Sequence, residues 1–483
     1  MIDYPSHLVR CYILAHFGSN PFWPHFYRVE FGPIPNLAMD VIVTPLAHWL
    51  PIVVSGQIFL TLLALVYVLG CSELARAAWG RPQWLALVAG LTLYNATLLW
   101  GFVNYLFGLG LFFLVFAVWL RLRRQMTPDA GAGLGLPGPL ARPSVKRVAW
   151  RSHARPRASQ CRFALLCGLG TLVYLAHLAA VAVLGVACVT VALMDWWPQR
   201  GRGPAWQSLL WQTGWLGAPG LLLLFGYLQR NGRTGRIGGY TLWHKIAALF
   251  TLVRSYNVRS DAAITLGLAA CAVVLLWHCR WRRELVVAGL VLLGCCLAMP
   301  NRILTSQNAD IRLSVPAFVL LILAVRPRWG RLQAAALCLA LALLGLHIGL
   351  IAHTWRGFNA RARDVLALGE KLPPGARVDV LEDVVFTGPL ANKWDFEVPK
   401  ILDYWSVSRG AYESNVFAQA GQQPLIKRTR FRNCWPGTDP GCLRNFDYLV
   451  TLNPPPTLQR QAQALGVPVA RWRGDTLWRL RLP

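Results

Sequence analysis

Charged residues are scarce in this 483-residue chain, where Asp, Glu, Lys and Arg together make up 14% of the sequence. Soluble globular proteins carry about 25% charged residues, so this composition excludes an ordinary soluble domain. Hydrophobic residues account for 55%, and runs such as 51–70 contain no charge. About 20 apolar residues cross the hydrocarbon core of a bilayer as an α-helix. The sequence therefore predicts a mainly α, polytopic helical membrane protein.

Acidic residues are scarcer than basic residues. Residues 1–355 contain 9 Asp or Glu against 30 Lys or Arg. A basic excess of this size can serve nucleic-acid binding, but here it lies between hydrophobic segments rather than on a soluble face. We therefore expect the bilayer, and no nucleic acid, as the partner, with the basic loops on the cytoplasmic side.

The apolar pattern predicts ten spans, although 162–194 could also form one long helix. They are 51–70, 83–98, 103–120, 162–175, 177–194, 208–227, 261–279, 284–299, 313–326 and 332–354. Ten spans place the Arg-rich loops on one side, including a flexible Gly-, Pro- and Arg-rich linker at 121–160. The outer side then holds residues 1–50 and the region after 355.

The sequence pattern changes after residue 355, which predicts a small outer-face α/β domain over 356–483. A helical stretch there is followed by a Pro-Gly stop and a strand, and 446–452 is a second apolar strand. A further helix ends at Gly466, and two strands flank a turn at Gly474. The chain would then consist of a first outer loop (1–50), a multi-span body (51–355) and this domain. If the domain is exported, Cys434 and Cys442 could form a disulfide.

Polar residues that could take part in catalysis or binding gather in the first outer loop. They are Asp3, Tyr4, His7, Arg10, Asn36 and Asp40. Four prolines interrupt 31–51, which predicts short helices along the membrane surface. Burial there raises the pKa of a carboxyl unless it is paired. Asp3 and Asp40 could instead be solvated loop residues, or they could cap the ends of helices. Four of the ten histidines precede residue 49, but they lack the close spacing of metal ligands.

A second group of polar residues lies in the later outer loops. Residues 228–260 carry six basic residues and no acid, which suits the phosphate or pyrophosphate of a lipid, or anionic headgroups in general. The residues that we single out are Lys245, Arg254 and Arg259, together with Asp310 and Arg312 at the mouth of a span. The last two could also form a simple interfacial ion pair.

The chain resembles the type-C (GT-C) glycosyltransferases, which are integral membrane enzymes. The resemblance rests on an acid, Asp3 in "DYPSHLVR", at the start of a large outer loop that ends in "GPIPNLAMDVIVTPLAHWLP". A multi-span body and a small outer α/β domain follow. The likeness is greatest to a bacterial group with DYP-x-HL-x-R and PNLAMD segments. It covers nearly the whole chain in architecture but only the first 50 residues in motif, and it does not specify the sugar.

This resemblance implies that a sugar moves, with inversion, from a polyprenyl-phosphate carrier to a glycan, lipid or protein acceptor on the periplasmic face of a bacterial inner membrane. The loop acid is the general base, which matches Asp3, with Asp40 as a second candidate. Our candidates for substrate contacts are Tyr4, His7, Arg10, Asn36, Lys245, Arg254, Arg259, Asp310 and Arg312. Arg254 and Arg259 are chosen from their charge and side of the membrane alone. A divalent metal is possible. The family places its acid after an initial span, which implies a further span upstream of Met1.

Two other functions fit a protein of this class. One is a non-catalytic factor for polysaccharide assembly or export, and the other is a lipid or sugar transporter. Transporters typically contain paired half-repeats and interrupted helices. The sequence shows no internal repeat, which favours the transferase.

Overall fold

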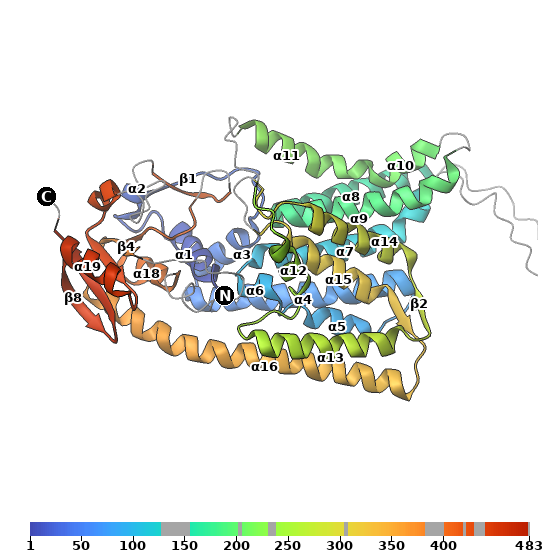
Figure 1. The fold of residues 1–483 in the computed structure, drawn as a ribbon. Coiled ribbons are helices and arrows are strands. Elements are labelled where there is room, and N and C mark those ends of the chain that lie inside the picture. Colours follow the sequence, from blue (N-terminus) through green and yellow to red (C-terminus); the bar gives the residue numbers. More distant parts are fainter. Residues whose placement is uncertain are drawn as a thin grey trace, which may run out of the picture.

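The computed structural model describes residues 1–126, 155–200, 205–229, 238–303, 308–381, 400–418, 422–428 and 440–481. Long helices form a bundle, and a small sheet with short helices lies at one end of it (Figure 1). Helix α1 (Tyr4–Ala15) lies between the two, and the long α16 (Arg331–Leu368) runs from the bundle to the sheet. The predicted mainly α, polytopic fold with a C-terminal α/β region is confirmed.

Seven segments of the described chain are long and apolar enough to cross a membrane. They correspond to α4 (Ile52–Trp79), α7 (Val103–Met126), α8 (Arg155–Ala176), α9 (Leu178–Trp196), α10 with α11 (Ala205–Thr213 and Gly217–Gln229), α13 (Val258–Leu276) and α16. The stretch 162–194 forms two helices, because His177 Nδ1 accepts a hydrogen bond from Ala179 N and caps α9.

Three of the ten expected spans are not among these seven. The segment 83–98 is divided into α5 (Leu85–Leu91) and α6 (Ala96–Leu99), because the Asn95 side chain accepts from Thr97 N and starts a new helix. The other two form α14 (Arg283–Ala298) and α15 (Ile311–Leu323), of 16 and 13 residues. Most of α15 is buried, so its apolar composition reflects packing against protein as much as contact with lipid.

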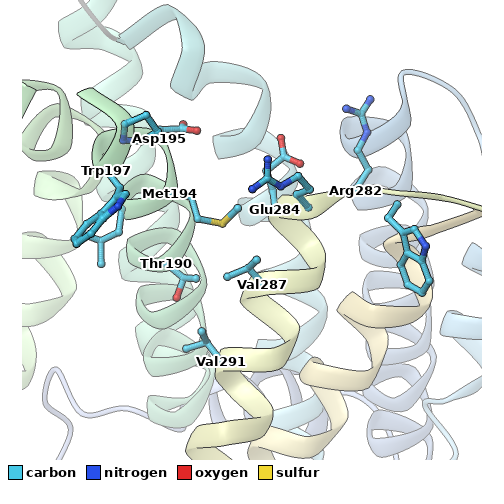
Figure 2. A pocket seen from close by; sticks show the side chains of 12 residues that line it. Thr190, Met194, Asp195, Trp197, Arg282, Glu284, Val287 and Val291 are labelled. Atoms are coloured by element: carbon cyan, nitrogen blue, oxygen red, sulfur yellow. The ribbon is translucent and has the colours of Figure 1, made fainter. Parts of the chain in front are cut away.

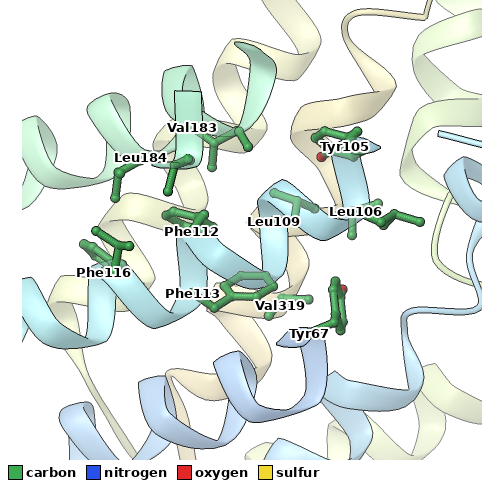
Figure 3. Close-up of a cluster of buried hydrophobic side chains, with 14 of the residues drawn as sticks. Tyr67, Tyr105, Leu106, Leu109, Phe112, Phe113, Phe116, Val183, Leu184 and Val319 are labelled. Carbon is green, nitrogen blue, oxygen red and sulfur yellow. The ribbon is translucent and has the colours of Figure 1, made fainter. Parts of the chain in front are cut away.

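Helix α7 lies at the centre of the bundle. In its span, 72% of the residues are buried, against 33% for α4, which therefore faces outward more. Phe112 and Phe116 of α7 stack at 5.7 Å between ring centroids. Tyr67 of α4 packs edge-on against Phe113 of α7, and Val183 of α9 and Val319 of α15 belong to the same cluster (Figure 3).

The C-terminal region contains a five-stranded sheet in the order β5-β4-β7-β9-β8. Its strands are β4 (Arg377–Leu381), β5 (Tyr412–Glu413), β7 (Tyr448–Thr451), β8 (Gly466–Trp472) and β9 (Asp475–Leu480). β4 is parallel to β5 and β7, whereas β9 is antiparallel to β7 and β8. The predicted strand at 446–452, the helix before Gly466 (α19, Pro456–Leu465) and the two strands around Gly474 are all present.

The N-terminal segment, residues 1–50, packs against the C-terminal region. Strand β1 (Tyr27–Val29) pairs antiparallel with β6 (Leu425–Lys427). Trp23 and Tyr27 are buried in one hydrophobic cluster with Tyr412 and Phe446. Segments almost 400 residues apart in the chain therefore share a core, which holds α1 against the sheet (Figure 1).

The remaining elements are short. They are α2 (Trp23–Phe26), α3 (Ala38–Ala47), α12 (Leu242–Leu249), α18 (Trp405–Arg409), the hairpin of β2 (Cys279–Trp281) with β3 (Val325–Pro327), and the 3₁₀ turns Trp197–Gln199, Gly214–Leu216, Gly369–Lys371, Leu402–Tyr404 and Pro440–Asn445. Most of the predicted linker, the arginines of 230–236 and the predicted Cys434–Cys442 pairing lie outside the described residues.

Candidate active site

Asp3 is the N-cap residue of α1, and the main chain on both sides of it is fixed. Ile2 N donates to Leu99 O at 2.9 Å, and Asp3 N donates to Trp100 O at 3.1 Å. Pro5 in the first turn favours helix formation at this point. Gly101 (φ +85°) closes the loop, and a Cβ there would lie 2.7 Å from Asp3 N. The loop between α6 and α7 therefore positions Asp3.

The Asp3 carboxyl group lies in an environment suited to a base. Burial raises its pKa to about 6, against the opposing effect of Lys400 and Arg312. Among the described residues, no side-chain hydrogen bond reaches this carboxyl, not even the usual helix-cap bond. A carboxyl with this pKa and free acceptor positions can take a proton near neutral pH.

The two cations that act on Asp3 come from different parts of the fold. Arg312 lies in the first turn of α15, with its guanidinium 4.4 Å from the centroid of the Phe102 ring. Lys400 belongs to the C-terminal region, where it donates to Asn415 O at 3.2 Å. Sequence reasoning singled out Arg312 and missed Lys400, because only folding brings residue 400 to the N-terminus.

Arg10 and Asp40 join α1 to α3. Arg10 Nε lies 2.7 Å from Asp40 Oδ1, and both side chains are fully excluded from solvent. Arg10 Nη1 also donates to His7 Nδ1 at 2.8 Å, so the ring proton of a neutral His7 is on Nε2. Burial, reinforced by Arg10, holds the pKa of His7 well below its usual value.

Tyr4 and Asn36 are also placed by neighbouring helices. Tyr4 Oη occupies the space beside Gly56 of α4, where a larger side chain would clash. Asn36 O accepts from Asn104 Nδ2 at 2.8 Å, which ties the loop before α3 to α7. Tyr4, His7 and Arg10 are thus part of the helix that Asp3 begins, and Asp40 of α3 pairs with Arg10.

Lys245 and Asp310 form a separate buried pair. Lys245 Nζ lies 2.5 Å from Asp310 Oδ2 and also donates to the carbonyl oxygens of Cys296 and Met299. The alternative of a simple ion pair between Asp310 and Arg312 is not formed, because Asp310 pairs with Lys245. These three acceptors occupy the three donors of the ammonium group. Among the described residues, Lys245 therefore has no N–H left to donate to a lipid phosphate.

Arg254 lies in the segment that precedes α13, and Arg259 lies in the first turn of that helix. Arg254 is partly buried near Asp261, and burial lowers its pKa. Arg259 is exposed in the first turn of the helix. Neither of them is among the groups that act on Asp3.

A buried pair of carboxyl groups, Asp403 and Glu413, adjoins α1 and was missed from the sequence. Ser6 Oγ donates to Asp403 Oδ2. Burial raises the pKa of both carboxyls, and the proximity of Asp403 raises that of Glu413 further. Within the described chain, neither Asp403 Oδ1 nor Glu413 Oε1 accepts a hydrogen bond. One proton shared between the two carboxyl groups would supply the missing donor. The sequence gives no sign that these two acids are buried, because they lie in a polar part of the chain.

The described residues contain no group of three His, Cys, Asp or Glu side chains that could hold a metal ion. Of the N-terminal histidines, His16 and His48 approach each other to 5.9 Å between ring centroids, and His7 binds Arg10. A cavity of about 840 Å³ lies at the other end of the bundle, beside Asp195 and Glu284 (Figure 2).

No protein-family model matches the chain, and no curated protein matches it. Among solved structures, the chain is similar to the crystal structure of ArnT from Cupriavidus metallidurans bound to undecaprenyl phosphate. The two are 13% identical, with a TM-score of 0.51, over 98% of this chain and 93% of that chain. At this identity the likeness shows the fold alone: the chain is a multi-pass membrane protein with an ArnT-like fold.

Proposed function

We propose that this protein is a membrane glycosyltransferase that moves a sugar from a polyprenyl-phosphate carrier to an acceptor hydroxyl, with Asp3 as general base. The observation that carries the proposal is the Asp3 carboxyl group. It is half-buried between the bundle and the C-terminal region, its pKa is raised to about 6, and two cations act on it. The ArnT-like fold supports the same proposal, because ArnT was solved with a polyprenyl phosphate bound.

In the proposed reaction, Asp3 removes the proton of the acceptor hydroxyl. The acceptor oxygen attacks the anomeric carbon of the sugar, and the bond from that carbon to the phosphate oxygen breaks. The electron pair of this bond leaves with the lipid phosphate, and the configuration is inverted. A positioned base contributes roughly 10²–10⁴-fold to such a step.

Arg312 is our candidate for the leaving phosphate. It lies at the end of α15, where a lipid headgroup can approach from the membrane, and its Nε is buried without a hydrogen-bond partner among the described residues. A guanidinium stabilises the charge that develops on a departing phosphate. Lys400, on the C-terminal side, helps to keep Asp3 ionised. Tyr4 and His7 adjoin the same helix turn and are candidates for sugar contacts.

The distribution of arginines supports a periplasmic location for this site. Arg282 and Arg326 both stack on Trp79 at the end of the bundle opposite the C-terminal sheet. Arg121 and Arg123 lie at that same end, on the last turns of α7. Because basic residues accumulate on the cytoplasmic side, the sheet and Asp3 would face the periplasm.

The test is turnover of purified protein with a panel of polyprenyl-phosphate hexoses and pentoses, followed by mass spectrometry of the released polyprenyl phosphate. We expect Asp3→Asn to lower the rate at least about 100-fold with unchanged melting temperature. Glu30→Gln is the matched control, because Glu30 is an exposed acid of the same loop, 2.9 Å from Arg28. Equal rates in Asp3→Asn and the wild type would overturn the role of Asp3. Donor flux without release of polyprenyl phosphate would instead support a transporter.

A further inference from the structure

A groove between α9 and α14 opens at the end of the bundle remote from Asp3 and has a volume of about 840 Å³ (Figure 2). Thr190, Leu193 and Trp197 line one wall at helical spacing on α9 and the turn that follows it. Val287 and Val291 line the facing wall on α14. Each helix thus contributes one mostly apolar stripe, and the groove runs along the direction of the spans.

The mouth of this groove carries unbalanced positive charge. Asp195 and Glu284 lie there, but both are paired with Arg123: Nη1 is 3.0 Å from Asp195 Oδ2, and Nη2 is 3.1 Å from Glu284 Oε1. Arg282 and Arg283 also line the mouth. In the part of the chain that the structure describes, neither of these two guanidinium groups has an ion pair with an acid.

Two tryptophans flank the mouth. Trp197 and Trp281 remain 62% and 49% exposed although they are large apolar side chains. Arg200 stacks on Trp197 with 3.8 Å between its guanidinium carbon and the ring centroid. Exposed tryptophan and arginine together are typical of the level of the lipid headgroups. The mouth therefore lies where phosphates of the bilayer are, and the apolar walls lie at the depth of the acyl chains.

We propose that this groove is a binding site for an anionic phospholipid. Its phosphate would be bound by Arg282 and Arg283, and one acyl chain would lie between the stripes of α9 and α14. Val291 is eight residues beyond Arg283, which places it roughly 12 Å deeper along the helix. The site is distinct from the proposed active site, and its occupancy does not depend on any transfer reaction.

The charge requirement can be tested by native mass spectrometry of the purified protein in detergent with added phosphatidylglycerol or phosphatidylcholine. We expect the wild type to retain phosphatidylglycerol, and the double variant R282Q/R283Q to bind it about tenfold more weakly. The control R328Q/R331Q removes the same charge from exposed arginines near the start of α16, outside the groove. It should bind as the wild type does. Equal weakening in both double variants, or equal retention of the two lipids, would overturn the proposal.

A second pair of variants tests independently whether an acyl chain occupies the groove. Val291 and Leu290 are neighbours on α14, with 38% and 53% exposure, but only Val291 lines the groove. Val291→Trp should fill the groove and reduce phosphatidylglycerol retention, whereas Leu290→Trp should not. Retention by Val291→Trp equal to that of Leu290→Trp would show that lipid binds elsewhere. Melting temperatures of all variants identify any that fail to fold.

Discussion

Arg10 and Asp40 form a bidentate ion pair inside the protein, with Nε–Oδ1 at 2.7 Å and Nη2–Oδ2 at 2.8 Å. Both side chains are fully excluded from solvent, and the pair connects α1 to α3. Because Asp3 begins α1, this connection contributes to the position of the proposed base. Asp40 was a candidate catalytic acid, and its two oxygens are occupied by Arg10.

Breaking this pair should destabilise the protein strongly. Asp40→Asn leaves the Arg10 charge buried without a counter-charge, which costs about 3–5 kcal/mol. The double variant Arg10→Met/Asp40→Leu should recover most of that loss. Denaturant unfolding in detergent measures the loss of stability. The exposed ion pair of Arg121 with Glu73 is the control, and breaking it should cost less than about 1 kcal/mol. A loss below about 1 kcal/mol in Asp40→Asn would contradict this account.

The pH dependence of turnover should report the ionisation of the Asp3 carboxyl group. A base must be deprotonated, so kcat/KM should fall as the pH drops below about 6, the pKa of Asp3. Lys400 lowers that pKa, so Lys400→Met should move the acid limb to higher pH. Lys371→Met, at an exposed lysine of the C-terminal region, is the control and should leave the profile unchanged. A limb near pH 4 in the wild type would argue against Asp3 as the base.

The Asp403–Glu413 pair should make stability fall with rising pH. Burial raises the pKa of both groups, so the folded state binds protons that the unfolded state releases above about pH 4. The stabilising contribution of this pair is therefore greatest at low pH and is lost as the pH rises toward the folded pKa values. Glu413→Gln removes one of these protons and should flatten the curve between pH 5 and 7.5. This window lies below the pKa of Lys427, which burial lowers to about 8. Melting temperatures across this range test it, with exposed Glu370→Gln as a control that should keep the wild-type slope.

Gly101→Ala should impair activity through Asp3. The positive φ of +85° is strained for alanine, and its Cβ would lie 2.7 Å from the backbone nitrogens of Asp3 and Tyr4. We expect at least a tenfold loss of turnover and a loss of stability of about 1–3 kcal/mol. Gly18→Ala is the control, since nothing lies within 4 Å of a Cβ there. Full activity in Gly101→Ala would show that this loop does not position the base.

Much of the fold was predictable because its signals are local. Apolar length identified the spans, and strand and turn patterns identified the α/β region around Gly466 and Gly474. The break at Asn95 was not predicted, because an apolar run looks the same whether it contacts lipid or protein. The GT-C resemblance directed attention to Asp3, although its catalytic role stays a prediction.

The amino-acid sequence by itself determined the class of the protein, since hydrophobicity and periodicity act between neighbouring residues. Only the tertiary structure decided which charges meet. Lys400 acts on Asp3 across almost the whole chain, Lys245 is occupied by Asp310, and Asp403 lies buried beside Glu413. The pKa of a carboxyl depends on the burial and the charges around it in space, and long-range packing alone sets both.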